Sequence, residues 1–250
     1  MDEGTLRDRL WHGFAQLQML LGGQAAAGTI LERDGMVASF VPAAPDSPTL
    51  NAAIALERTL DPATLDALAE RYAQIDAHRW GVWTDGDKHA VIAVLEQAGL
   101  RMTSSSPGMG AAIEDLALNG SAALTTRSDL ATVGHVNDLA YGNPDGRLER
   151  TLAPLPPGLL RAYRADHGGR PASVALALHH AQDCGISFVA TAPHARRQGL
   201  ASEVMQRVAL DARESGCTST SLQATNLGEK LYTALGYRTV SNMQLWERRA

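Results

Sequence analysis

The fold is decided by residues 186–201, which read ISFVATAPHARRQGLA. An apolar run typical of a β-strand ends at a proline, a basic turn follows, and Gly199 begins a helix predicted over 199–214. The first N–H groups of a helix have no partner within it, and the helix dipole favours negative charge there. Gly199 lets the backbone approach a ligand closely, and Arg196 and Arg197 add positive charge. The stretch therefore predicts a strand–turn–helix unit that binds an anion such as a diphosphate.

A second informative stretch, residues 222–238, reads LQATNLGEKLYTALGYR. It predicts a strand, a bend, and a helix over 228–235 that ends at Gly236. The turn 196–201 matches the Arg/Gln-x-x-Gly-x-Gly/Ala signature of the GNAT superfamily of N-acetyltransferases. The second stretch resembles that family's Leu-Tyr-x-x-Leu-Gly-Phe/Tyr motif. Because both motifs occur in the family's order and separation, the second half of the chain resembles a GNAT domain.

The resemblance implies acetyl-CoA as cosubstrate and acetyl transfer to an amine by direct attack on the thioester. It also implies a cofactor site. The backbone of Val189, Ala190 and Thr191, splayed from the neighbouring strand, would bind the pantetheine arm and polarise the thioester carbonyl. Asn226 would lie near the pantetheine, although its neighbours depart from the family pattern. The remaining residues implied to contact the cofactor form the diphosphate turn: Arg196, Arg197, Gln198, Gly199, Leu200, Ala201 and Ser202.

Tyr232 would protonate the departing CoA thiolate. A phenol has an ordinary pKa of about 10, above the value of about 8.5 for a thiol, so it carries its proton at neutral pH. The residues leave open that Tyr232 is only a core aromatic of an amphipathic helix, and that 196–201 is an ordinary basic turn. No local pattern selects a general base among the candidates, which are Glu149, His179, His180, Asp183 and Glu247.

Composition limits the partners. The chain has 250 residues and a formal net charge of −5, with no dense Lys/Arg block, so nucleic acid and membrane are not expected as partners. Two cysteines, Cys184 and Cys217, lie in no metal-ligand spacing, so no metal site is expected, and both should be small buried hydrophobes. The N-terminus lacks a basic n-region, which favours a cytoplasmic protein. The expected acceptor is a small-molecule or peptide amine, and a homodimer is left open.

The two halves follow one order of elements. The sequence VLEQAGLR (94–101) is similar to LYTALGYR (231–238), which suggests a degenerate tandem repeat. We therefore expect an α/β (α+β) fold of two GNAT-like halves, each a mostly antiparallel, twisted mixed sheet flanked by helices, over 1–120 and 121–250. Leu95 stands where the second half has Tyr232. Residues 60–64 carry an acid and no glycine where the phosphate turn would lie. The first half is therefore expected to be a non-catalytic copy.

Periodicity predicts the individual elements. In the first half, Asp34-Gly35 predicts a hairpin turn, Asp61 is expected to cap the helix 62–75, and a closing strand is expected at 109–116. In the second half, a helix is expected at 128–141 and a loop at 143–158. The further elements expected are helices at 6–21 and 89–97 and strands at 29–33, 36–41, 51–57, 80–83, 159–165, 172–179, 184–191, 218–223 and 239–247. Two alternatives to an enzyme remain: an acyl-CoA-binding sensor or scaffold, and a fold without a ligand.

Overall fold

The computed structural model describes residues 1–25, 27–118 and 125–249. Contacts divide the chain into two compact units, each assembled from two segments. Unit 1 comprises Met1–Gly13 and Met109–Arg238, and unit 2 comprises Phe14–Gly108 and Thr239–Ala250. Helix α1 (Glu3–Gln24) and strand β5 (Arg101–Ala112) each pass from one unit into the other. The expected boundary between residues 120 and 121 lies outside the described residues and stays a prediction.

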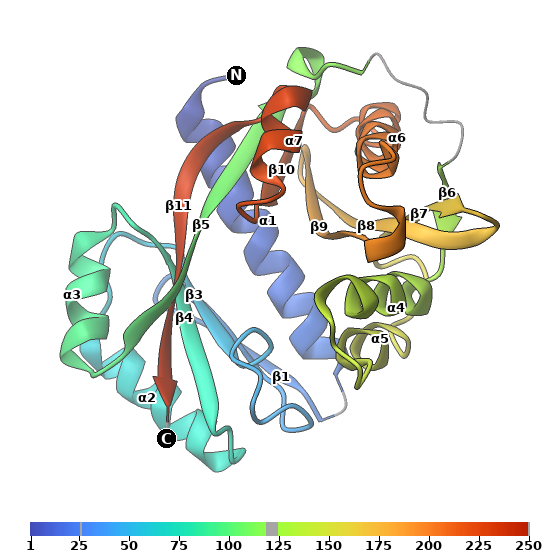
Figure 1. Cartoon of the computed structure of the whole chain (residues 1–250). Coiled ribbons are helices and arrows are strands. Elements are labelled where there is room, and N and C mark those ends of the chain that lie inside the picture. The colour runs from blue at the N-terminus through green and yellow to red at the C-terminus, as the bar shows by residue number, and fades with distance from the viewer. Residues whose placement is uncertain (26, 119–124, 250) are drawn as a thin grey trace. The chain divides into compact units, whose positions relative to one another are not determined.

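Unit 1 is built on a mixed sheet with the strand order β5-β10-β9-β8-β7-β6. Strands β6 to β9 pair antiparallel, and β9 pairs parallel with β10. Helices α6 and α4 lie on opposite sides of strands β7 and β8 (Figure 1). The elements are β6 (Thr125–Ser128), α4 (Leu130–Tyr141), α5 (Arg147–Leu152), β7 (Arg161–His167), β8 (Arg170–His180), β9 (Asp183–Thr191), α6 (Leu200–Glu214), β10 (Ser219–Gln223) and α7 (Glu229–Leu235).

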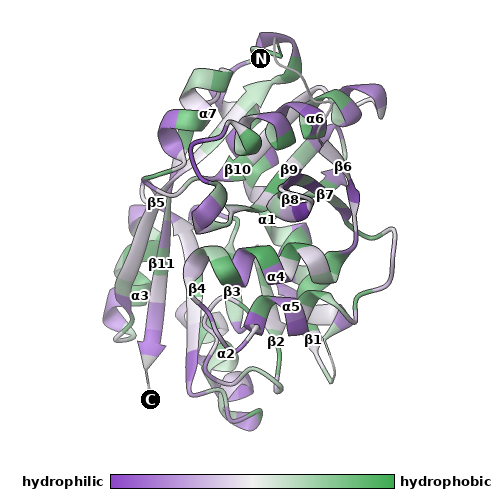
Figure 2. Cartoon of the chain, turned by 45° about the vertical axis from the view of Figure 1, so that its right-hand side comes forward, coloured by the Kyte–Doolittle hydropathy of each residue, from purple (hydrophilic) through white to green (hydrophobic). Residues whose placement is uncertain are grey.

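Helix α6 forms because its sequence repeats an apolar residue about every turn. Leu200, Val204, Val208 and Ala212 are all buried on one side of the helix, as their spacing predicts. They pack against the strand residues of the unit 1 core, which also contains both cysteines. The hydropathy of the helices that flank the sheet alternates along the ribbon in the same way (Figure 2). This packing fixes the direction of α6 and hence the position of its N-terminus.

The strands of unit 2 have the order β1-β2-β3-β4-β11-β5 and belong to the same 11-stranded mixed sheet as those of unit 1. The Asp34-Gly35 turn has φ of 49° and 70°, the paired positive values that a tight hairpin requires. Tyr72 is fully buried between Phe40 and Trp80, with ring centroids 4.6 and 4.7 Å away. The elements are β1 (Thr29–Arg33), β2 (Met36–Phe40), β3 (Ala52–Ala55), α2 (Pro62–Gln74), β4 (Arg79–Asp85), α3 (His89–Gln97) and β11 (Arg238–Arg249).

Three expectations about elements were wrong. The strand expected at 109–116 runs from Arg101 to Ala112, because a polar, exposed run extends it next to β11, and Ile113–Asp115 form a 3-10 helix. The loop expected at 143–158 contains α5, and the helix expected from Ser128 is preceded by the short strand β6. In each case the missed element lacks an apolar period. It is held instead by backbone pairing or by a neighbouring helix.

Helices α4 and α5 pack unusually closely because of Gly134. A Cβ at this position would lie 2.3 Å from the Cα and 2.5 Å from the N of Glu149. Asp138, one turn later in α4, accepts hydrogen bonds from the backbone N–H groups of Leu148 (3.2 Å) and Glu149 (2.9 Å). The carboxylate of Asp138 therefore caps the start of α5, which has no N-cap side chain of its own.

We predict that Gly134→Ala lowers the free energy of unfolding by about 1–3 kcal/mol, because the added methyl group pushes the α5 backbone away from α4. The matched control is Gly23→Ala in α1, where an added Cβ has no atom within 4 Å. The control should be neutral or stabilising by about 1 kcal/mol, the helix-propensity gain of alanine over glycine. Denaturant unfolding of both variants measures this. Equal stability of the two variants would refute the close contact.

Candidate functional site

The turn before α6 has a backbone conformation suited to an anion. A short 3-10 helix, Pro193–Ala195, ends β9, and α6 begins after Gly199. The φ angle is positive at Arg197 (63°) and at Gly199 (80°) but not at Gln198. Alternating signs of φ turn successive N–H groups toward one side, which makes a concave nest of donors. The nest opens directly onto the N-terminus of α6, where the helix dipole adds to its positive field.

The donors of this turn are available. Within the described part of the chain, no protein acceptor is bonded to the amides from Arg197 to Ser202, and the first bond of α6 runs from the N–H of Glu203 to the carbonyl of Gly199 (3.1 Å). Arg197, Gln198 and Gly199 are exposed. A Cβ added to Gly199 would meet no atom within 4 Å, so space remains in front of the turn. The residues present therefore fit a diphosphate.

Strand β9 separates from β10 just before this turn. The parallel ladder between them ends at Ile186 and Leu222, whereas β9 continues to Thr191 beside β8 alone. Phe188 has a φ of 53°, and the β8–β9 register shifts at the same place, which is a β-bulge. Residues 187–191 thus turn one backbone edge toward the side that β10 has left. Val189, Ala190 and Thr191 lie in this segment.

Tyr232 of α7 is almost completely buried, with 6% of its surface exposed. Burial raises the pKa of its hydroxyl well above the ordinary value, and Tyr141 at the end of α4 raises it further. The ring stands edge-on to Tyr237 at a centroid distance of 6.0 Å. A Cβ on Gly228 would lie 2.8 Å from Cε2 of Tyr232, so the glycine leaves room for the ring. The phenol therefore stays protonated and held in one place.

Asn226 lies in the exposed loop between β10 and α7. Among the described residues, no hydrogen bond holds its side chain. Leu227, its neighbour, is 90% exposed.

Sequence reasoning missed three residues of this region: Phe188, Tyr141 and Gly228. Gly228 had a signal, since glycine stands one turn before the tyrosine in the same helix. The bulge at Phe188 had none, because neither glycine nor proline marks it.

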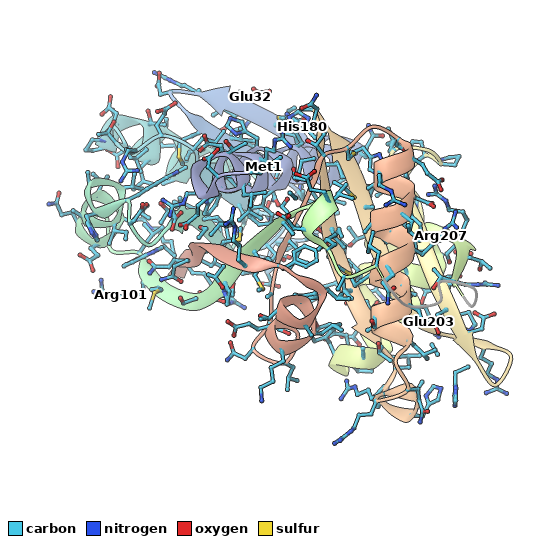
Figure 3. All side chains as sticks on the ribbon, turned by 90° about the horizontal axis from the view of Figure 1, so that it is seen from above. Met1, Glu32, Arg101, His180, Glu203 and Arg207 are labelled. Atoms are coloured by element: carbon cyan, nitrogen blue, oxygen red, sulfur yellow. The ribbon has the colours of Figure 1, made fainter. Side chains whose placement is uncertain are left out.

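The candidate bases have other partners. Asp183 accepts hydrogen bonds from the hydroxyls of Ser219 and Ser221, both at 2.5 Å, and burial raises its pKa. His179 and His180 lie in the same β8–β9 hairpin. His180 is near the C-terminal end of α6, at the opposite end of this helix from Glu203 in its first turns (Figure 3). Burial lowers the pKa of His179. These groups are therefore at the wrong end of β9 for chemistry at the turn.

The other two candidate bases form ion pairs. Oε2 of Glu149 lies 3.1 Å from Nδ1 of His135. Glu247 belongs to unit 2, is buried, and binds Arg79 (2.7 Å) and the hydroxyl of Thr103 (2.7 Å). Among the described residues no group of three or more His, Cys, Asp or Glu side chains could hold a metal ion. No described helix is long and apolar enough to span a membrane.

Comparison with known proteins agrees with this geometry. Residues 160–239, which contain the bulge, the turn and Tyr232, match the model of the acetyltransferase (GNAT) domain. This segment is therefore a GNAT domain, an acyltransferase domain that generally uses acetyl-CoA. None of the curated proteins matches the sequence.

Solved structures resemble the whole chain. The GCN5-related N-acetyltransferase from Kribbella flavida has 19% identity and a TM-score of 0.69, over 96% of this chain and 95% of that one. One from Sphaerobacter thermophilus has 14% identity and a TM-score of 0.57, over 88% and 82%. A tandem GNAT protein from the clavulanic acid biosynthesis pathway has 11% identity and a TM-score of 0.59, over 97% and 95%. At these identities the likeness establishes the fold, which is that of GNAT proteins.

We predict that Gly199→Ala weakens binding of coenzyme A about tenfold, because alanine disfavours the positive φ by about 1–2 kcal/mol and the turn relaxes. Gly216→Ala is the matched control. Gly216 follows the opposite end of α6, has a φ of 84°, and has no atom within 4 Å of an added Cβ. It should cost similar stability and leave coenzyme A affinity unchanged. Calorimetric titration of both variants measures this; equal affinities would remove the turn from the binding site.

Proposed function

We propose that this chain transfers an acyl group, acetyl in the first instance, from a CoA thioester to a primary amine. The observation that carries the proposal is the exposed turn at Arg197 to Gly199. The amides from Arg197 to Ser202 have no protein acceptor in the described structure and lie at a helix N-terminus. Backbone donors at a helix N-terminus have no partner within the helix and can bind water or an anion. Donors held ready beside positively charged Arg197 fit the diphosphate of the cofactor.

In this proposal β9 provides the second part of the site. The backbone edge at Val189 to Thr191 pairs with the pantetheine arm, whose amides alternate donors and acceptors as a strand does. A backbone N–H near the bulge at Phe188 donates a hydrogen bond to the thioester carbonyl. Such a bond stabilises the negative charge that develops on this oxygen as the amine attacks. Together the edge and the turn would hold the thioester in a fixed orientation for attack.

Tyr232 acts on the sulfur. The amine nitrogen forms a bond to the carbonyl carbon, the C–S bond breaks, nitrogen loses one proton and sulfur gains one. The Tyr232 hydroxyl donates a hydrogen bond to the leaving sulfur and passes its proton to it, and the proton released by nitrogen restores the phenol through water. Because burial raises the pKa of Tyr232, the phenol is a weaker acid than in water but remains protonated wherever free amines exist.

We infer that the first half binds no CoA. Asp61 caps α2 by accepting from the N–H of Ala63 (2.9 Å), so a carboxylate occupies the position that a diphosphate would need. Lys88 donates from Nζ to the carbonyls of Ala55, the last residue of β3, and Leu56, both at 2.7 Å. The buried lysine thus uses the carbonyls at the end of the strand that leads toward α2. Both contacts support a non-catalytic role for residues 1–120.

The proposal is tested by incubating the protein and acetyl-CoA with a panel of primary amines, from small amines to lysine-containing and N-terminal peptides, and measuring released CoA thiol. Turnover with at least one amine is expected. The alternative is an acyl-CoA sensor or scaffold, which would bind coenzyme A without releasing thiol under any condition of the panel. A protein that binds no coenzyme A at millimolar concentration would exclude both.

We predict that Tyr232→Phe lowers kcat about 10²–10⁴-fold, the usual contribution of a general acid, and changes coenzyme A affinity little. The phenylalanine keeps the ring in the space beside Gly228 and removes only the hydroxyl. Steady-state kinetics with an active amine and calorimetry with coenzyme A measure the two effects. Unchanged kcat would make Tyr232 a packing residue.

The pH dependence follows from the direction of the Tyr232 shift. A raised pKa keeps the donating, protonated form populated to higher pH, so this group gives no loss of kcat up to about pH 10, its ordinary pKa. On the acidic side the rate should rise with pH as the acceptor ammonium loses its proton. A pH–rate profile of kcat tests this. The assignment would be contradicted if kcat decreased with rising pH from a point below about pH 9 and this decrease disappeared in Tyr232→Phe.

A further inference from the structure

The two adjacent arginines of the turn have different surroundings. Arg196 donates from Nη2 to the carbonyl of Ala140 (2.8 Å) and from Nε to the carbonyl of Thr191 (3.3 Å). The guanidinium of Arg197 has no protein acceptor among the described residues, and the residue is exposed. From the sequence, both arginines are expected to supply positive charge to the turn in the same way. The structure separates them, because one guanidinium is already bonded within the protein.

The carbonyl of Ala140 belongs to the last turn of α4. Helix α4 ends at Gly142 in a left-handed conformation (φ 70°), and the N–H groups of Gly142 and Asn143 bond to the carbonyl of Asp138. The carbonyl of Ala140 is one of those a helix leaves without an internal partner at its C-terminus. A positive side chain is favourable there because the helix dipole is negative at this end. Arg196 therefore acts as a C-terminal cap supplied by another element.

This cap connects three parts of the site. The carbonyl of Thr191 is the end of β9, Arg196 itself is in the diphosphate turn, and Ala140 precedes Tyr141 at the end of α4. Tyr141 is 56% exposed and close enough to Tyr232 to influence its hydroxyl. Helix α4 packs on β8 and β9. Its C-terminal end is thus joined through Arg196 to the end of β9, the strand that holds the thioester in the proposed function.

We propose that Arg196 is a positioning residue that ties the end of α4, on the acceptor side of the site, to the cofactor turn, and that Arg197 is the guanidinium that contacts the diphosphate. The inference rests on the proposed acyl transfer. The two arginines therefore have different roles, one in positioning α4 and the other in binding the cofactor. Loss of Arg196 should lower the acceptor kcat/KM, while the backbone donors still bind the cofactor. Loss of Arg197 should lower the affinity for the cofactor.

The matched variants are Arg196→Gln and Arg197→Gln, which remove the same charge from neighbouring positions. Calorimetry with coenzyme A gives the dissociation constant, and initial rates with the most active amine of the panel give the acceptor KM and kcat. For Arg197→Gln we expect coenzyme A affinity to fall about tenfold and the acceptor KM to stay within about twofold. For Arg196→Gln we expect coenzyme A affinity within about threefold and acceptor kcat/KM lower by about tenfold or more.

Arg196→Lys distinguishes geometry from charge. Lysine keeps the charge near the turn but lacks the planar fork that reaches two carbonyls at once, so it should resemble Arg196→Gln in acceptor kcat/KM. Two results would overturn the proposal. One is a loss of coenzyme A affinity in Arg196→Gln as large as in Arg197→Gln with unchanged acceptor kinetics. The other is wild-type values for Arg196→Gln in both assays.

Hydrogen–deuterium exchange separates failure of this inference from failure of the proposed activity, since it needs no acceptor. Peptides covering residues 138–143 should exchange faster in Arg196→Gln than in wild type or in Arg197→Gln, because the end of α4 has lost its cap. Unchanged exchange would refute the tie between Arg196 and α4. Faster exchange in a protein that acetylates no amine of the panel would support the tie and refute the acyl transfer.

Discussion

The structure depends on one constraint: the backbone that leads into α6 must keep its N–H groups unpaired and pointing outward. Gly199 and the positive φ of Arg197 impose this conformation, and the buried face of α6 holds it against the sheet. Leaving backbone donors without protein partners is unfavourable unless water or a ligand satisfies them. A helix N-terminus with such a nest has the geometry of an anion-binding site.

Unit 1 contains further features that the proposed site uses. The separation of β9 from β10 frees a backbone edge beside it, and the bulge at Phe188 redirects that edge. Gly228 makes space for the ring of Tyr232, and Arg196 connects the turn to the end of α4. All of these residues except Ala140, at the end of α4, lie in the segment 160–239 that matches the GNAT domain model.

The sequence predicted features that depend on neighbours in the chain. The helix of α6, the hairpin at Asp34-Gly35 and the cap at Asp61 were confirmed because apolar spacing, turn residues and caps act locally. Pairings between distant segments were not predictable. β11 joins β4 across more than half of the chain, and Arg196 binds Ala140 at a sequence separation of 56 residues. No local pattern encodes either contact, and the roles of the site residues remain predictions.

The most direct measurement of the central claim is a titration of ¹⁵N-labelled protein with coenzyme A, followed by NMR of the backbone amides. We predict that the amide resonances of Arg197 to Ser202 shift most strongly with coenzyme A. Pantetheine, which lacks the diphosphate, should leave these chemical shifts unchanged. If saturating coenzyme A shifts other amides but not these, the anion is bound elsewhere. The role assigned to the start of α6 would then be wrong.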